Sequence, residues 1–308
     1  MKKIIICICL SVVLGGCSVY RTYKRPDVAV IDSLYRQQIS PADSVASIAD
    51  LSWKELFTDP HLQKLIETGL CNNSDLGIAR LRAEEAEALL QSARLSYLPS
   101  ISLSPQGTIG KVEHSKTTKS YDLATSASWE IDIFGKLTNT KREARVVLEQ
   151  SEAYRQAVQT QLIATIANSY YTLLMLDEQL NISRRTARNW SENLRVMKAL
   201  KNAGQTTDMA VAQTEASKLS VDASLLSLER QITELENTLL SLLGSVPGDI
   251  TRSTLSSQSF PDTLLVGVPL QLLQRRPDVR QSEAVLAAAF YVTNQARAAF
   301  FPSITLSG

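Results

Sequence analysis

Histidine and cysteine are both scarce, with two and four copies in a chain of 308 residues. His61 and His114 lie far apart and no Cys/His cluster accompanies them, so no metal site with the usual ligand spacing is predicted. Two of the cysteines precede Cys17 in an apolar N-terminal stretch, which leaves Cys71 alone in the rest of the chain. An internal disulfide is therefore not expected, and Cys71 is interpreted as a partly buried small residue.

An excess of charge of either sign is also missing, because 32 basic residues balance 31 acidic ones. No basic stripe stands out, which argues against nucleic acid as a partner. The sequence has no Gly-rich phosphate loop and no convincing nucleophile–base arrangement, so we predict that the protein is not an enzyme. Acidic residues in mid-chain, such as Asp177 and Glu178, are interpreted as solvated helix charges.

Proline is absent between Pro105 and Pro247, so nothing forces a kink in the stretch between them. Residues 135–243 of this stretch are predicted to form a helical hairpin with its tip at residues 203–207. At ~1.5 Å per residue, the outgoing helix from about Lys136 to Asn202 would be roughly 100 Å long. Ordinary globular helices are several times shorter.

Apolar side chains recur every three or four residues along both helices of this hairpin, which is the period of a coiled coil. Only two serines interrupt the seam. An ordinary amphipathic helix pair in a soluble protein is the plain alternative. The outgoing seam is Ile166, Ser169, Leu173, Leu176, Leu180, Ser183, Ala187, Trp190, Leu194 and Met197, and the return seam is Leu225, Leu228, Ile232, Leu235, Leu239 and Leu242.

Residues 1–16 have the features of a signal peptide: two lysines, then an apolar run too short to span a bilayer. The following Leu14-Gly15-Gly16-Cys17 resembles the bacterial lipobox, so we predict cleavage before Cys17 and a covalent lipid on it, with no other cofactor. Two or more acyl chains would anchor the protein stably in a membrane. Residues 17–50 are predicted to be an extended tether, and Ser18 does not look like an inner-membrane retention signal. The alternative is a chance cysteine beside an ordinary signal peptide.

Residues 98–134 change from a helical pattern to two stretches in which apolar side chains alternate with small or polar ones, separated by a polar loop at residues 111–120. A transmembrane β-strand needs only about ten such residues, so this segment is predicted to be a transmembrane β-hairpin with a polar face toward a wet lumen. An edge hairpin in a soluble sheet is the alternative. The predicted membrane-facing residues are Tyr121, Leu123, Trp129, Ile131 and Ile133.

An internal repeat appears when the end of the chain is shifted back by 203 residues, because seven of the twelve positions from 93 to 104 then match. Residues 51–97 are accordingly predicted as the opening helices of a first repeat, with a helix start at Asp59-Pro60. Residues 244–276 are predicted as an irregular connection and residues 277–308 as the start of a second repeat. Since this repeat stops inside a strand, we expect the front part of a longer protein or a truncated reading frame.

Six motifs in order resemble those of the TolC-like outer-membrane factors, specifically the lipoprotein subgroup that serves RND-type efflux pumps. The resemblance covers about residues 50–308 together with the lipobox. The motifs are Trp53–Pro60, Asn73–Leu76, Trp129–Lys136 at a strand-to-helix junction, Ala203–Thr207 at a hairpin tip, and Leu273–Asp278 and Ala296–Ile304 at the opening of the second repeat.

The resemblance implies a mainly α fold with a β-hairpin, in which a long coiled-coil helical hairpin forms part of a tunnel through the periplasm. It also implies a homotrimer in the bacterial outer membrane, each full-length subunit giving four strands to a twelve-stranded barrel. Such a channel is a passive duct for small molecules such as drugs. Its implied partners are outer-membrane lipid, a periplasmic adaptor and an inner-membrane RND-type pump.

The same resemblance places the adaptor-docking tip at Gly204, Thr207 and Asp208. The family often has an acid at the position of Ala210, whereas the acid here is Asp208. Residues that constrict the family's channels lie largely in the second repeat, so no gate is assigned.

Two further functions remain as alternatives. A periplasmic adaptor lipoprotein also has a lipobox and a helical hairpin, but its hairpin is flanked by compact β-rich domains rather than by a repeat of the same unit. A truncated, non-functional fragment of a channel is the other alternative. If the 308-residue chain is the whole product, too few strands are present to close a barrel, and we predict no pore.

Overall fold

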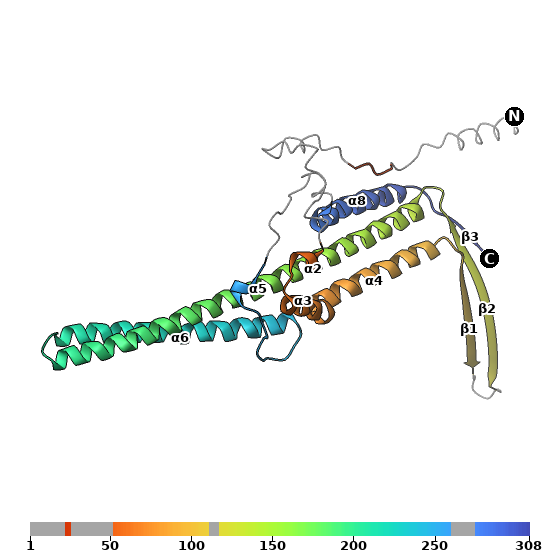
Figure 1. The fold of residues 1–308 in the computed structure, drawn as a ribbon. Helices are drawn as coiled ribbons and strands as arrows, with labels where there is room; N and C mark the ends of the chain where they lie inside the picture. The colour runs from red at the N-terminus through yellow and green to blue at the C-terminus, as the bar shows by residue number, and fades with distance from the viewer. Residues whose placement is uncertain (1–21, 26–51, 111–116, 260–274) are drawn as a thin grey trace, which may run out of the picture. The chain divides into compact units, whose positions relative to one another are not determined.

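A computed structural model of the protein describes residues 22–25, 52–110, 117–259 and 275–308 (Figure 1). The described residues form two compact units. We call them the hairpin unit, made of residues 52–78 and 156–259, and the strand unit, made of residues 22–25, 79–110, 117–155 and 275–308.

The hairpin unit contains α2 (Trp53–Leu56), α3 (Pro60–Asn72), most of α5 (Lys136–Asn202) and α6 (Asp208–Leu242). Helix α5 has 67 residues, which corresponds to roughly 100 Å at the usual helical rise. Helix α3 begins where the sequence predicts, because the Asp59 side chain accepts a hydrogen bond from the His61 N–H and Pro60 fills the first turn.

The core of the hairpin unit lies where α3, α5 and α6 pack together. Leu62 and Ile66 of α3 are fully buried, as are Ile166 and Leu173 of α5 and Leu239 of α6. Every predicted seam position in both long helices is buried or half-buried. The coiled-coil interpretation of the hairpin is therefore confirmed.

A short turn joins α5 to α6. Gly204 has a φ of +73°, its N–H donates to the Lys201 carbonyl, and the Gln205 N–H donates to the Leu200 carbonyl. This pair of bonds is a Schellman ending, which satisfies the last carbonyls of a helix and favours glycine at the left-handed position. Thr207 then caps α6 by accepting from the Ala210 N–H at 3.3 Å.

The strand unit contains most of α4 (Ser74–Leu95), the first turns of α5, and α8 (Pro277–Ala298). Helices α4 and α8 both have 22 residues. Pro277 and Ala298 lie 203 positions beyond Ser74 and Leu95, which is the offset of the internal repeat. The two sequence copies thus form the same element.

Three strands complete the strand unit: β1 (Ser100–Gly110), β2 (Thr118–Ile131) and β3 (Ile304–Ser307). They form one antiparallel sheet in the order β1-β2-β3, so β2 is central. Tyr121 pairs with Gly107, and Trp129 pairs with Leu306.

Two sequence predictions are wrong in detail. Ile133 is not part of the strand, because β2 ends at Ile131 and the chain bends before α5. Cys71 is exposed rather than partly buried. The buried side of α3 carries Leu62, Ile66 and Gly69, and Cys71 points away from it.

Several predictions concern residues outside the described ranges: the signal peptide, Cys17, most of the tether, part of the loop between β1 and β2, and much of the 244–276 connection. The described part of that connection is irregular apart from a short turn of 3₁₀ helix, η4 (Leu255–Ser257). Across the described helices, none combines the length and apolarity that crossing a membrane requires.

Candidate functional site

The sheet has two chemically different faces, because the register places residues of like character side by side. Opposite Tyr121 and Leu123 on β2 stand Gly107 and Pro105 of β1, and opposite Trp129 stands Leu306 of β3. We call this side the apolar strand face. It consists of Ile101, Leu103, Pro105, Gly107 and Ile109 of β1, Tyr121, Leu123, Thr125, Ala127, Trp129 and Ile131 of β2, and Ile304 and Leu306 of β3, with one charged residue, Lys119, opposite Ile109 near the β1–β2 loop.

The opposite side of the sheet carries small and polar residues. Ser102 and Ser126, on paired positions, share a hydrogen bond of 2.8 Å between their hydroxyls. Ser104 stands opposite Ala124, and Gln106 stands opposite Asp122. Because the strands pair in this register, the alternation of apolar and polar residues along each strand gives the whole sheet one apolar and one polar face.

The apolar strand face is open to its surroundings. Tyr121 is 77% exposed, Leu123 72% and Ile101 74%. Trp129 is 43% exposed, and Ile131 is half-buried. A contiguous apolar surface of this kind marks a site that meets lipid or another protein.

The junction between β2 and α5 is held by Asp132. Its carboxylate accepts from the Leu137 N–H at 3.0 Å, the Thr138 N–H at 2.8 Å and the Thr138 hydroxyl at 2.6 Å. These bonds satisfy donors in the first turn of α5, where a negative charge is also favoured by the helix dipole. The need for this cap explains why the chain leaves the sheet before Ile133.

Two aromatic side chains join α4 to the same junction. The Trp129 indole N–H donates to the Tyr97 carbonyl at 2.9 Å, and the Tyr97 hydroxyl donates to the Thr138 hydroxyl oxygen at 3.0 Å. The roots of the strands are therefore tied to the ends of α4 and α5.

The predicted tip residues come together at the turn between α5 and α6. Gly204 and Thr207 are exposed, and nothing lies within 4 Å of the position that a Gly204 side chain would occupy. Asp208 pairs with Lys201, yet its side chain is 84% exposed. Met209 beside it is 82% exposed. The tip thus presents an acid and an apolar side chain that are both largely exposed.

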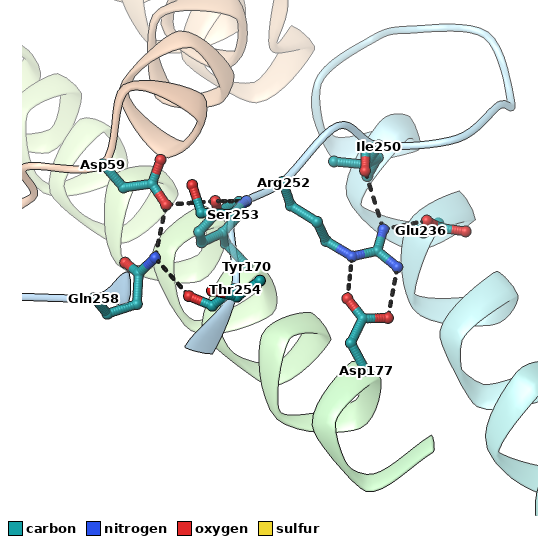
Figure 2. A network of polar contacts seen from close by, with 9 residues as sticks. All are labelled: Asp59, Tyr170, Asp177, Glu236, Ile250, Arg252, Ser253, Thr254 and Gln258. Carbon is teal, nitrogen blue, oxygen red and sulfur yellow. Dashed lines mark hydrogen bonds and ion pairs between the residues drawn. The ribbon is translucent and has the colours of Figure 1, made fainter. Parts of the chain in front are cut away.

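The hairpin unit contains a polar network that no pattern in the sequence predicts (Figure 2). The Arg252 guanidinium donates to both carboxylate oxygens of Asp177, at 2.5 and 2.9 Å. It also donates to Glu236 and, at 3.1 Å, to the Ile250 carbonyl. Its bonds to Asp177 and Glu236 outweigh burial and raise the pKa of Arg252, so the guanidinium stays charged.

Asp59 is the centre of the second half of this network. Its carboxylate accepts from the Tyr170 hydroxyl at 2.6 Å and from the Gln258 amide at 2.9 Å, while the Ser253 N–H donates to Tyr170 at 3.1 Å. Burial alone would raise the pKa of Asp59, but bonds from Tyr170, Gln258 and the His61 N–H lower it overall. Burial and the Asp59 bond raise the pKa of Tyr170 to about 12.

The network ties the segment after the hairpin to three helices, because Asp59 precedes α3, Tyr170 and Asp177 lie on α5, and Glu236 lies on α6. The interpretation of Asp177 as a solvated charge is therefore wrong. Glu178 is exposed, 3.7 Å from Arg185. Since Arg252 is 75 residues from Asp177, no local pattern in the sequence indicates the pair.

Among the described residues, no group of three or more histidine, cysteine or acidic side chains is arranged to hold a metal ion. In the network of Arg252 and Asp59, the carboxylates accept hydrogen bonds from donors of the protein itself.

The chain resembles known efflux proteins over most of its length. The sequence profile described as outer membrane efflux protein matches residues 65–245. The probable efflux pump outer membrane protein TtgC of Pseudomonas putida is 29% identical over 306 residues, which cover 96% of this chain and 63% of TtgC. The probable outer membrane lipoprotein SilC of Salmonella typhimurium is 32% identical over 303 residues, covering 96% of this chain and 65% of SilC.

The solved structure of the open state of the Neisseria gonorrhoeae MtrE outer membrane channel has the same fold. It aligns with a TM-score of 0.78 and 29% identity, covering 94% of this chain and 66% of MtrE. The chain thus spans about two thirds of the length of these relatives. Because the family profile matches more than half of the chain, in the segment that contains β1, β2 and the long hairpin, this protein belongs to the outer membrane efflux protein family.

Proposed function

We propose that this protein is a subunit of an outer-membrane channel in a tripartite efflux system, and that it acts as a passive duct for small molecules such as drugs. The observation that carries the proposal is the two-faced sheet in the same chain as a 67-residue coiled-coil helix. Efflux names and outer-membrane locations among the relatives support it.

In this proposal the sheet crosses the membrane. The apolar strand face meets lipid, and the face of Ser102, Ser126 and Asp122 lines water. A strand in lipid must pair both of its edges, and this requirement supports assembly from several copies. We propose a homotrimer in its full-length form, with residues 98–134 in the membrane and residues 135–243 in the periplasm.

The hairpin tip is the proposed docking site for a periplasmic adaptor, which in turn meets an inner-membrane RND-type pump. Exposure of Asp208 and Met209 supports this role, as does the Gly204 turn, which places no side chain in the way. A covalent lipid on Cys17 is proposed to anchor the protein, and no other cofactor is needed for a duct.

The test is complementation of a bacterial strain that lacks its outer-membrane efflux channel. One arm expresses the 308-residue chain, and the other expresses the complete reading frame that contains it. We expect the complete frame to lower the accumulation of drugs or dyes in the cells. Unchanged accumulation of every compound tried, with the protein present in the outer membrane, would overturn the proposal.

The same experiment distinguishes the alternatives. Activity from the complete frame but not from the 308-residue chain would show that this chain alone does not assemble. Restored efflux in a strain that lacks its adaptor, but not in one that lacks its channel, would favour the alternative that this protein is a periplasmic adaptor.

A further inference from the structure

A basic cavity lies between α4 and α5 in the strand unit, next to the strand roots. Its volume is about 570 Å³. Four of its lining residues are cations and none is an acid. The lining consists of Leu90, Arg94, Tyr97, Thr138, Lys141, Arg142 and Arg145. We call it the root cavity.

The root cavity is built by one face of each helix. Thr138, Lys141, Arg142 and Arg145 recur at the three- and four-residue spacing that places side chains on one side of α5. Arg94 stands in the last turn of α4, where the helix dipole favours a cation. The helix dipole does not explain the cations of α5, because they lie close to the N-terminal end of that helix, where a cation is not favoured.

The charges of this cavity are only partly neutralised within the protein. Among the described residues, neither Arg94 nor Lys141 forms an ion pair, and Lys141 instead lies 5.6 Å from the centre of the Tyr97 ring. Arg145 is paired with Glu149 at 3.6 Å, but both side chains are more than half exposed. The nearby Asp132 is already engaged by three donors at the start of α5.

The cavity also has apolar surroundings. Leu90 in its lining is buried. Trp129 on the apolar strand face donates to the Tyr97 carbonyl. A binding site that offers cations and exposed apolar side chains together suits an anionic lipid better than a free ion.

We propose that the root cavity binds the phosphate of an anionic phospholipid headgroup, with Arg94 and Lys141 as its principal ligands and the acyl chains on the side of Trp129. The presence of a bilayer beside the cavity rests on the proposed function. The binding chemistry itself does not.

The test measures lipid retained by the purified chain in a non-ionic detergent, by native mass spectrometry. Phosphatidylglycerol is the anionic probe, phosphatidylcholine the zwitterionic comparison and inorganic phosphate the free anion. We expect phosphatidylglycerol to be retained on the order of tenfold better than phosphatidylcholine, with a preference that weakens at high salt. Equal retention of the two lipids, or equally tight binding of inorganic phosphate, would overturn the proposal.

The decisive variant is Arg94→Gln combined with Lys141→Gln, and Arg195→Gln combined with Lys198→Gln is its matched control on the hairpin. Both remove one arginine and one lysine that are exposed. We expect the first to lose the preference for phosphatidylglycerol and the second to retain it. An unchanged preference in the first variant, or an equal loss in both, would contradict the site. Far-ultraviolet circular dichroism checks folding, and Arg94→Gln alone serves if the double variant does not fold.

Failure of this site and failure of the proposed function can be told apart. Binding in detergent requires neither a channel nor a pump. A chain that prefers phosphatidylglycerol but does not restore efflux would overturn the proposed function alone. Restored efflux without any preference for phosphatidylglycerol would overturn only the proposal that the root cavity binds an anionic lipid.

Discussion

Arg252 binds both carboxylate oxygens of Asp177, with Nε–Oδ2 and Nη2–Oδ1 distances of 2.5 and 2.9 Å. The Arg252 side chain is only 14% exposed, and it also contacts Glu236. The pair fastens the segment that leaves α6 to the outgoing helix α5. Without the guanidinium, two carboxylates would face each other in a half-buried position.

We therefore expect Arg252→Gln to destabilise the hairpin unit. The loss should be about 2 kcal/mol, below that of fully buried pairs because Asp177 remains a third exposed. Urea unfolding followed by circular dichroism measures it. The control is Arg184→Gln, which breaks an exposed pair with Glu229 and should change stability by less than ~0.5 kcal/mol. Equal effects of the two substitutions would contradict a fastening role for Arg252.

Asp59 predicts how stability depends on pH. Its pKa is lower in the folded protein than in the unfolded chain, since hydrogen bonds from Tyr170, Gln258 and the His61 N–H outweigh the effect of burial. The stabilisation is therefore complete above the unfolded value of about 3.9 and is lost as pH falls through the folded pKa.

The corresponding measurement is the urea midpoint between about pH 2 and 6. Asp59→Asn should be less stable near neutral pH and should show a shallower decline in acid than the unsubstituted protein. Glu67→Gln, which removes an exposed partner of Lys54, should keep the acid decline. An Asp59→Asn protein that declines as steeply as its parent would show that other carboxylates control the acid transition.

Because the sheet has two different faces, a lysine at two adjacent positions of β2 should affect assembly in the membrane to different extents. Leu123→Lys places a charge on the apolar strand face, and a lysine facing lipid costs on the order of 2–4 kcal/mol near the middle of the bilayer. Ala124→Lys places the same charge on the polar face. We expect the first to reduce the assembled fraction in outer membranes and the second to leave most of it, measured by heat-modifiable mobility on gels. Similar loss in both would argue against a lipid-facing role for Leu123.

Cys17 is predicted to carry the lipid anchor. Cys17→Ala should abolish incorporation of labelled palmitate, because the acyl chains have no other attachment site in this scheme. Cys71→Ala is the control and should incorporate palmitate normally. Palmitate that persists on the Cys17→Ala protein would refute the assignment.

The hairpin tip can be tested through charge and backbone separately. Asp208→Asn removes an exposed charge and its ion pair with Lys201 but leaves the backbone bonds of the turn, whereas Gly204→Ala strains a position with a φ of +73° and should cost about 1 kcal/mol locally. If the tip docks an adaptor, both should lower crosslinking to it and raise drug accumulation. Glu192→Gln, farther from the tip on α5, is the control. Normal crosslinking in both tip variants would argue against docking at these residues.

Much of the fold follows from local patterns in the chain. The seam from Ile166 to Leu194 and its partner on α6 are buried as their spacing predicts, because a period near 3.5 residues has one packing solution for helices. Asp59-Pro60 and Ala203-Gly204 mark a helix start and a helix end for reasons of backbone geometry alone. Nothing in alternation alone reveals where β2 ends, since Ile133 continues the pattern while Asp132 is needed to cap α5.

The long helical hairpin, the alternating strands, the repeat offset of 203 residues and the family can all be predicted from the sequence, because each depends on residues close together or on a repeated order. Contacts between side chains that are far apart in the sequence are visible only in the folded chain. Folding brings Arg252 into contact with Asp177 and places Arg94 and Lys141 in the lining of one cavity. The register of the three strands separates the sheet into an apolar and a polar face. These contacts depend on how distant segments pack, and the information for that packing is spread over the whole chain.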